Sequence, residues 1–274
     1  MTVVESAVEV RIEGLSKAFG DHRVLRGVDL EIQRGECVAI VGGSGCGKTV
    51  LLNHVLGQLE PDAGRVRVAD HARDDAPLVD IDDLQDGELD RIHTHWGVVF
   101  QRNALFSGSV YDNIALWLAE VRNLEAEAIA PIARRVLAAV GLETDDAFLD
   151  ADVGELSGGM AKRLAVARAL AMEPRVMCYD EPTTGLDPAT AAQIQDMVLA
   201  THEDPDPVVR PRTTIIITHD KDLLRRLEPR IVMLDHGRIL FDGSFADFER
   251  ADEPAIRPYF ELMPVLHQRP VADA

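Results

Sequence analysis

The stretch of sequence that decides the fold reads GGSGCGKT and occupies residues 42–49. It fits the phosphate-binding pattern G-x-x-x-x-G-K-[ST], in which glycines let backbone N–H groups converge on phosphate oxygens. Its flanks fit as well, because residues 37–41 form the short apolar run of a buried strand and helically spaced apolar residues follow Thr49. This context favours a nucleotide-binding loop over a glycine-rich turn that merely precedes a helix.

Each residue type in this loop has a chemical reason. Lys48 would reach the β- and γ-phosphates of a nucleotide, and the Thr49 hydroxyl would ligate Mg²⁺. The helix that begins here adds the positive end of its dipole. The predicted nucleotide-binding residues of the loop are Gly42, Gly43, Ser44, Gly45, Cys46, Gly47, Lys48, Thr49 and Val50. Nothing in the sequence makes Cys46 catalytic.

A second glycine-containing motif, LSGGM, occupies residues 156–160 and opens a helix predicted over 160–172. Ser157, Gly158 and Gly159 therefore place a hydroxyl and backbone N–H groups at a helix N-terminus, where an anion can bind. Taken alone, this arrangement is more often a simple N-cap.

A mostly apolar strand predicted over residues 175–181 ends in two carboxylates, Asp180 and Glu181. Asp180 can hold the Mg²⁺ shell, and Glu181 can take a proton from an attacking water. These carboxylates would add hydrolysis to nucleotide binding.

In this order and spacing, the three motifs resemble those of the ATP-binding cassette (ABC) ATPases, and the resemblance covers nearly the whole chain. It implies ATP and Mg²⁺ as cofactors. Gln101 matches a glutamine that contacts Mg²⁺ and senses the permease, and His219 matches a histidine that contacts the γ-phosphate. Asp187, in the motif GLD, matches an aspartate that couples two active sites. Phe19 falls where the family stacks an aromatic ring on adenine, although burial in the core is an equally good interpretation.

The resemblance completes the predicted site. The expected catalytic residues are Glu181, His219 and Gln101, and the expected Mg²⁺ ligands are Thr49, Gln101 and Asp180. Two residues depart from the usual pattern, since Met160 replaces the common glutamine of the LSGGM signature and Val50 replaces a frequent threonine or serine. Neither change removes a predicted contact, because Ser157 and Thr49 are retained.

Two stretches resemble one branch of the family, the ATPase subunits of Mce/Mla-type lipid transporters. They are residues 156–163, with methionine in the signature, and residues 100–115; residues 254–260 also look like the ending of that branch. This implies lipid or phospholipid transport with a lipid-binding MCE-domain subunit. The alternative within transport is the ATPase subunit of an amino-acid or other solute importer, in which glutamine is usual at the signature.

The composition argues against a nucleic-acid partner. The 274 residues include 47 acidic and 28 basic ones, which gives a formal net charge of −19. Such a surface repels phosphate backbones. A DNA-repair-type ABC ATPase is the rival class, but it generally interrupts the cassette with a long coiled coil, and only residues 102–156 separate Gln101 from Ser157.

The chain shows no apolar run long enough to span a membrane and no start typical of a secretory signal. Its three widely spaced cysteines suit reduced thiols. We therefore expect a cytoplasmic protein, and the resemblance implies that it is held on the inner face of the cell membrane through a separate integral-membrane permease. If, as in the family that the chain resembles, the signature of one cassette completes the site of another, a single phosphate loop and a single signature imply a homodimer.

Strands that alternate with helices, many of them apolar throughout, predict an α/β protein with a largely parallel sheet. The resemblance specifies an ABC ATPase domain at 8–250, with a P-loop (RecA-like) core at about 35–100 and 172–250, an antiparallel β subdomain at about 8–34 with 64–70, an α-helical subdomain at about 101–171, and a tail at 251–274. Helical spacing runs over 109–142 and 190–202, and a hairpin is expected over 231–241.

Two segments of the surface carry further expectations. The acidic segment 74–90 is typical of a solvated loop with a short helix. Residues 102–120 contain apolar side chains that should mostly form the core of the helical subdomain, namely Phe106, Val110, Tyr111, Ile114, Leu116 and Trp117. The resemblance also places the groove for a permease helix here, so some of Leu105, Phe106 and Tyr111 are expected to stay partly exposed.

Overall fold

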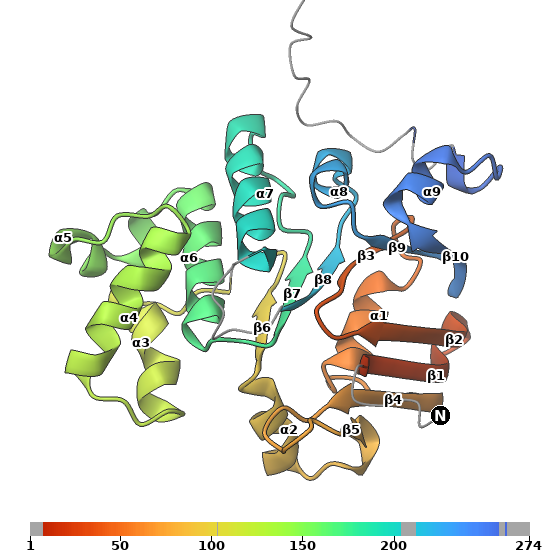
Figure 1. Cartoon of the computed structure of the whole chain (residues 1–274), viewed down its shortest axis with the longest axis horizontal. Coiled ribbons are helices and arrows are strands. Elements are labelled where there is room, and N and C mark those ends of the chain that lie inside the picture. Colours follow the sequence, from red (N-terminus) through yellow and green to blue (C-terminus); the bar gives the residue numbers. More distant parts are fainter. Residues whose placement is uncertain (1–7, 103, 204–211, 258–260, 262–274) are drawn as a thin grey trace, which may run out of the picture. The chain divides into compact units, whose positions relative to one another are not determined.

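The computed structural model describes residues 8–102, 104–203, 212–257 and 261, and the chain forms two compact units. The first unit consists of the chain up to Ile92 and from Thr213 onward, and the second unit is His93–Arg212. Figure 1 shows the elements of both units, coloured along the sequence. Each unit combines strands and helices, which confirms the predicted α/β class. The subdomain boundaries proposed from the resemblance stay a prediction.

The first unit contains an antiparallel sheet with the strand order β2-β1-β4-β5. Its strands are β1 (Val8–Phe19), β2 (His22–Gln33), β4 (Ala63–Ala69) and β5 (Leu78–Asp80). β1 and β2 form a hairpin in which Phe19 pairs with His22. On the other side of β1, Val10 pairs with Val68 of β4. Residues 8–34 and 64–70 therefore share one sheet.

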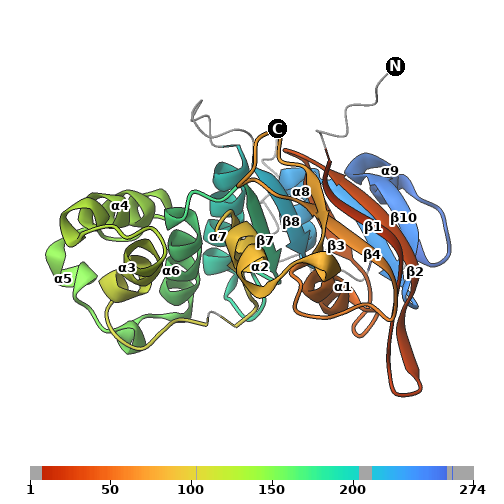
Figure 2. The same cartoon turned by 90° about the horizontal axis from the view of Figure 1, so that it is seen from below.

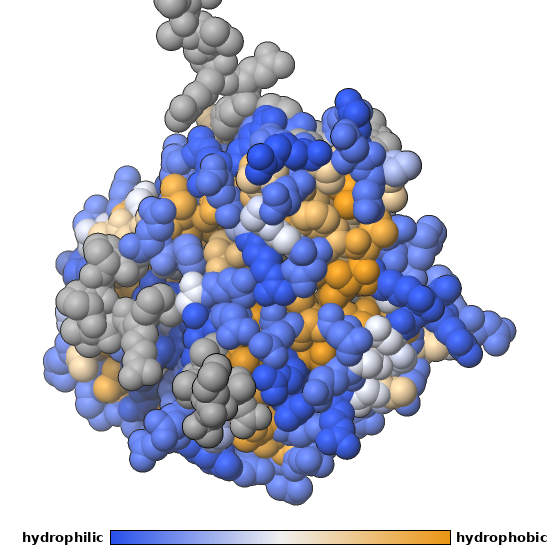
Figure 3. All heavy atoms as spheres, turned by 45° about the vertical axis from the view of Figure 1, so that its right-hand side comes forward, coloured by the Kyte–Doolittle hydropathy of each residue, from blue (hydrophilic) through white to orange (hydrophobic). Residues whose placement is uncertain are grey.

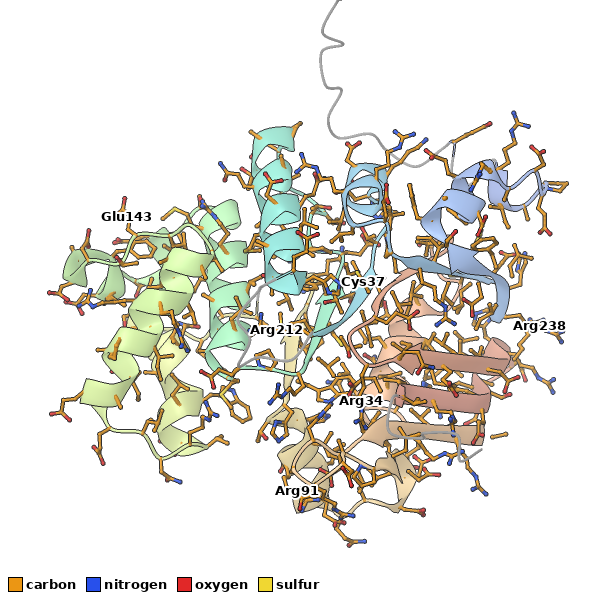
Figure 4. All side chains as sticks on the ribbon, viewed as in Figure 1. Arg34, Cys37, Arg91, Glu143, Arg212 and Arg238 are labelled. Carbon is orange, nitrogen blue, oxygen red and sulfur yellow. The ribbon has the colours of Figure 1, made fainter. Side chains whose placement is uncertain are left out.

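The acidic segment 74–90 is more ordered than a solvated loop. Val79 of β5 pairs with β4 at the edge of the antiparallel sheet. The expected short helix is α2 (Asp86–His93), whose Arg91, labelled in Figure 4, donates to the fully buried carboxylate of Asp70 at 2.9 Å. The loop expectation was wrong for β5, because apolar residues inside the acidic run supply an edge strand.

Buried parallel strands of the first unit carry the candidate phosphate loop. β3 (Cys37–Val41) pairs in parallel with both β8 (Thr213–Ile217) and β9 (Arg230–Asp235). β10 (Arg238–Ser244) pairs with β9 in the antiparallel sense, which confirms the predicted hairpin. The helix α1 (Lys48–Val55) follows β3 after the glycine-rich loop, as the sequence predicts.

Two short helices that the sequence analysis missed complete the core of the first unit. They are α8 (Lys221–Leu227) and α9 (Phe245–Arg250). Leu224 and Phe248 from these helices pack in one cluster with Ile256, which is 1% exposed. The segment expected to be a tail therefore begins with packed residues. Residues 258–260 and 262–274 lie outside the described residues.

The second unit carries the parallel strands β6 (Trp96–Val99) and β7 (Val176–Asp180) (Figure 1) and a group of helices (Figure 2). The helices are α3 (Val110–Glu120), α4 (Ala126–Ala139), α5 (Asp146–Leu149), α6 (Gly158–Ala171) and α7 (Pro188–His202). Of these, α3, α4 and α6 pack side by side.

The helical spacing over 109–142 is interrupted rather than continuous. Asn123, between α3 and α4, has a φ of 52°, which a continuing right-handed helix does not allow. Ser109 and Asp112 begin α3 with a capping box. The helices expected over 160–172 and 190–202 are confirmed as α6 and α7. Asn103, part of the predicted permease segment, lies outside the described residues.

Candidate functional site

The candidate phosphate loop depends on two of its glycines. Gly42 has a φ of 147°, and a Cβ there would stand 2.2 Å from the carbonyl oxygen of Leu234. Gly47 has a φ of 112°, and its Cβ would lie 2.9 Å from a methyl group of Leu25. A larger residue at either position would strain the backbone and displace a neighbour. The loop therefore takes this shape only with glycine at both ends.

The middle of the loop is open to solvent. Gly43, Ser44 and Gly45 are exposed, and within the described part of the chain their amides donate no hydrogen bond. The Lys48 ammonium donates to the carbonyl oxygens of Gly42 at 2.8 Å and Gly43 at 3.1 Å, which holds its charge beside the loop. Thr49 is exposed in the first turn of α1. Exposed amides, an ammonium and a helix N-terminus suit a phosphate group.

Two other residues of the loop are held by local contacts. Cys46 is half-buried, and this burial raises the pKa of its thiol although the Lys48 charge opposes the shift. The thiol therefore stays neutral at neutral pH and adds no negative charge where phosphate would bind. The carbonyl oxygen of Val50 lies 2.7 Å from Nδ1 of the buried His54 ring.

His219 lies at the same edge of the parallel strands as the phosphate loop. It follows β8, in which Ile217 pairs with Ile40 of β3, and the Thr218 amide donates to the Ile40 carbonyl at 3.4 Å. Gly42 and His219 therefore follow the carboxyl ends of neighbouring parallel strands, where ligands bind in α/β sheets. The imidazole of His219 is exposed.

Phe19 is not a core residue. It ends β1 with 49% of its surface exposed, and the Lys17 ammonium lies 5.8 Å from the centroid of its ring. The core interpretation of Phe19 is therefore wrong. An exposed ring at this position can stack on a planar base.

The hairpin of β1 and β2 also lines a basic pocket of about 600 Å³. Its lining residues are Ser16, Lys17, Ala18, Arg23, Leu25, Arg26, Gly27, Asp62 and Arg238. Lys17 forms an ion pair with Asp62 at 3.0 Å. Arg238, labelled in Figure 4, comes from β10. The sequence analysis missed this pocket, because its basic residues come from two hairpins that are far apart in the chain.

In the second unit, two of the three predicted Mg²⁺ ligands lie at the carboxyl ends of paired strands. Val99 at the end of β6 pairs in parallel with Tyr179 of β7. Gln101 and Asp180 therefore lie at the same edge of this strand pair. Gln101 is exposed, and Asp180 is 8% exposed. The two residues combine an accessible amide with a nearly buried carboxylate.

Glu181, the predicted general base, has an unusual backbone conformation. Its φ is 48°, in the left-handed region that glutamate rarely adopts. Its carboxylate accepts a hydrogen bond from the Thr184 hydroxyl at 3.2 Å. Backbone strain of this kind is concentrated at functional positions, because the surrounding structure must over-determine it.

The LSGGM signature begins α6. The hydroxyl oxygen of Ser157 accepts a hydrogen bond from the Met160 amide at 3.2 Å, so Ser157 is an N-cap. Ser157 and Gly158 are exposed, and the first turn carries no acidic residue, which leaves the helix N-terminus accessible to an anion. Close packing also requires glycine at position 159, because a Cβ there would lie 2.4 Å from a methyl group of Thr190 in α7. The sequence analysis missed this requirement.

Asp187 is the N-cap of α7. Its carboxylate accepts hydrogen bonds from the amides of Ala189 at 3.0 Å and Thr190 at 3.1 Å. Hydrogen bonds from Thr190 lower the pKa of Asp187, so this exposed carboxyl stays ionised at neutral pH. The structure thus gives Asp187 a local role, and the coupling of two active sites stays a prediction.

The apolar segment after Gln101 is partly exposed, as expected. Phe106 is 45% exposed, and Leu105 and Tyr111 are half-buried. The Arg168 guanidinium lies 5.1 Å from the centroid of the Phe106 ring. The expectation for α3 was right for the buried Val110 and Ile114.

That expectation was wrong for two residues of α3. Leu116 is 43% exposed and Trp117 is 42% exposed. The buried face of this helix centres on Val110, Ile114 and Leu118, which recur at intervals of four. Leu116 therefore falls on the opposite side and Trp117 at the margin of the buried face. Apolar composition alone did not distinguish these sides.

Known proteins resemble this chain in sequence and in structure. The sequence model of the ABC transporter family matches residues 25–184. The chain is 33% identical over 267 residues to the chloroplastic Protein TRIGALACTOSYLDIACYLGLYCEROL 3 of Arabidopsis thaliana, covering 93% of this chain and 74% of that protein. It is 35% identical over 258 residues to the L-cystine transport system ATP-binding protein TcyN of Escherichia coli, covering 93% of this chain and 98% of that protein.

The chain is also similar to a solved dimeric ATP-binding cassette in a post-hydrolysis state with ADP and Pi. The TM-score is 0.72 at 30% identity, and the match covers 86% of this chain and 98% of that one. Within the described ranges, none of the helices has the length and hydropathy to cross a bilayer. On the face drawn in Figure 3, hydrophilic residues surround hydrophobic patches.

Proposed function

Because this chain belongs to the ABC transporter family as an ATP-binding, ATP-hydrolysing subunit, we propose that it powers lipid transport through a separate integral-membrane permease. One observation carries the choice of cargo: the 33% identity to a protein named for trigalactosyldiacylglycerol, which is a lipid. The methionine of the signature, Met160, supports the same branch. We place the subunit at the inner face of the membrane, bound to the permease and with no role for nucleic acid.

An amino-acid importer is the second candidate. The 35% identity to a protein named for L-cystine transport favours it. Both candidates use the same ATPase chemistry and differ in the cargo and in the other subunits of the complex. A lipid transporter of this branch would include a lipid-binding MCE-domain subunit.

Purification of the complex from membranes tests this proposal. The co-purifying proteins and extractable lipids are identified by mass spectrometry. We expect an integral-membrane permease, an MCE-domain subunit and a bound lipid. An amino-acid-binding subunit without enriched lipid would contradict the lipid assignment and support the importer.

We assign the ATP-binding roles to residues that the structure places at strand and helix ends. The proposed nucleotide contacts are Phe19, the loop residues 42–50, Ser157, Gly158 and Gly159. The proposed catalytic residues are Glu181, His219 and Gln101. In this assignment Glu181 accepts a proton from the attacking water, and His219 contacts the γ-phosphate.

Taken one by one, the side chains proposed as ligands are of types that suit a magnesium ion bound with a nucleotide. Thr49 exposes a hydroxyl, and Asp180 holds a nearly buried carboxylate, which are ligand types that Mg²⁺ prefers. Gln101 is the third proposed ligand. When bound, the ion would neutralise charge that develops on the phosphate oxygens.

The signature predicts chemistry that depends on a dimer. Ser157→Arg should leave ATP binding by the monomer intact, because the phosphate loop is unchanged, but block ATP-driven dimerisation by placing a bulky cation at the helix N-terminus. Equimolar mixing with Lys48→Ala should restore activity, since each mixed dimer then holds one complete composite site. ATPase assays on the separate and mixed variants measure this effect.

A capping variant provides the control for Ser157→Arg. Losing an N-cap costs about 1 kcal/mol of helix stability, and Ser244→Ala removes the equivalent hydroxyl from α9 in the first unit. We expect that control to remain active. If Ser157→Arg hydrolyses ATP as a strict monomer with activity linear in concentration, the composite-site proposal is wrong.

The permease is proposed to contact the segment around Phe106. Phe106→Glu should weaken permease binding more than thermal stability, because the side chain is 45% exposed and the new carboxylate can pair with Arg168. Val121→Glu places the same charge at another exposed apolar position, 39% exposed, and serves as the control. Co-purification of Phe106→Glu with the permease at wild-type stoichiometry would place the docking surface elsewhere.

A further inference from the structure

Lys162 is almost completely buried in the second turn of α6. It is 2% exposed, and its ammonium donates to the carbonyl oxygens of Phe100 and Gln101, each at 3.0 Å. Burial lowers the pKa of Lys162, and the nearby charge of Asp180 opposes this shift. A buried cation is costly without compensating partners, and the two carbonyls together with Asp180 supply them.

Both carbonyls belong to the first two residues after β6, Phe100 and Gln101, which begin the segment 100–106. A second cation of α6 holds the other end of this segment. The Arg168 guanidinium donates to the Ala104 carbonyl at 2.9 Å and lies over the Phe106 ring. Burial lowers the pKa of Arg168 as well. Two side chains of α6 therefore donate hydrogen bonds to the backbone of segment 100–106, near its start and near its end.

A buried asparagine of α3 adds a third anchor. Asn113 is fully buried, and its side chain accepts from the Phe106 amide and donates to the Phe106 carbonyl, both at 2.9 Å. Between the anchors, the side chains of Gln101 and Arg102 remain exposed. The side chains of Gln101 and Arg102 are thus accessible, while backbone groups of Phe100, Ala104 and Phe106 are held by hydrogen bonds.

We propose that Lys162 and Arg168 are positioning residues that tie the backbone of segment 100–106 to the helix begun by Ser157. The inference rests on the proposed roles of Gln101 and Ser157. Lys162 lies in α6, five positions after its N-cap Ser157. The helix α6 therefore connects the proposed nucleotide contact of Ser157 to the proposed permease contact of segment 100–106. The pair transmits the permease signal and leaves binding of ATP at the cassette's own phosphate loop unchanged.

The experiment measures permease stimulation, the ratio of ATPase turnover in the purified complex to that of the isolated chain. Lys162→Met keeps an unbranched side chain, one heavy atom shorter, and removes its donors and charge. We expect stimulation to fall by about fivefold, within the range that coupling mutations produce. The KM for ATP should stay within about twofold, because the phosphate loop is unchanged.

Two variants separate positioning from a general loss of structure. Lys162→Gln retains N–H donors for the carbonyls and should restore most of the stimulation. Arg163→Met removes a neighbouring cation that donates to the Gly141 carbonyl, away from segment 100–106, and should leave stimulation at the wild-type level. A loss of stimulation in Arg163→Met as large as that in Lys162→Met would overturn the inference, because any perturbation of α6 would then suffice.

Arg168→Leu keeps the inference testable if Lys162→Met does not fold. It frees the Ala104 carbonyl at the other end of the segment and should also lower stimulation. Wild-type stimulation in a folded Lys162→Met, or in a folded Arg168→Leu, would overturn the inference. Absence of stimulation in the wild-type complex would instead overturn the proposed function, since no variant is involved.

Discussion

Replacing Glu181 with glutamine is expected to lower ATP turnover on the order of 10²–10⁴-fold, because the amide cannot accept a proton from the attacking water. Glutamine has nearly the same size and the same backbone preferences, so the conformation at φ 48° should persist. ATP should remain bound, since no proposed phosphate contact is removed. Steady-state ATPase assays of the complex and a nucleotide-retention assay measure the two effects.

Glu143→Gln is the matched control for this change. Glu143 lies in the second unit between α4 and α5, it is exposed, and Figure 4 shows it at the outside of that unit. The same loss of a carboxylate there should leave turnover unchanged. If Glu181→Gln hydrolyses ATP at a near wild-type rate while Glu143→Gln does the same, Glu181 is not the general base.

The parts of the site that could be predicted from the sequence are those with short-range signals. The phosphate loop combines fixed residue types with a strand before it and a helix after it, and both are confirmed as β3 and α1. His219 and Asp180 follow short apolar runs that are typical of buried strands, so their position at strand ends was predictable. Local periodicity therefore located the chemical groups.

What could not be predicted depends on contacts between distant residues. The need for Gly159 comes from the approach of Thr190, and the carbonyl partners of Lys162 lie in a segment some sixty residues earlier in the chain. Such partners carry no periodic signal, because tertiary packing selects them. The exposure of Phe19 has the same origin, since an aromatic residue near a hairpin turn suits either a core or a surface.

Lys48→Ala is expected to weaken ATP binding by roughly 10- to 100-fold, the loss of one charge-assisted contact to phosphate. The ammonium donates to the carbonyls of Gly42 and Gly43 at an open loop, so its removal should change thermal stability little. Equilibrium binding of a fluorescent ATP analogue measures the affinity, and thermal unfolding measures the stability.

The protein has a net charge of −19, so the loss of any one positive charge increases its long-range repulsion of ATP. A second variant separates this long-range repulsion from the loss of the direct contact between Lys48 and phosphate. Arg65→Ala removes a cation from an exposed position of β4 in the same unit. Long-range repulsion would weaken ATP binding equally in both variants and would fade at high salt, because exposed charges are screened beyond about 10 Å at 0.1 M. A direct contact with phosphate predicts a large loss for Lys48→Ala alone that persists at high salt. Undiminished binding by Lys48→Ala would mean that the loop does not hold the phosphates.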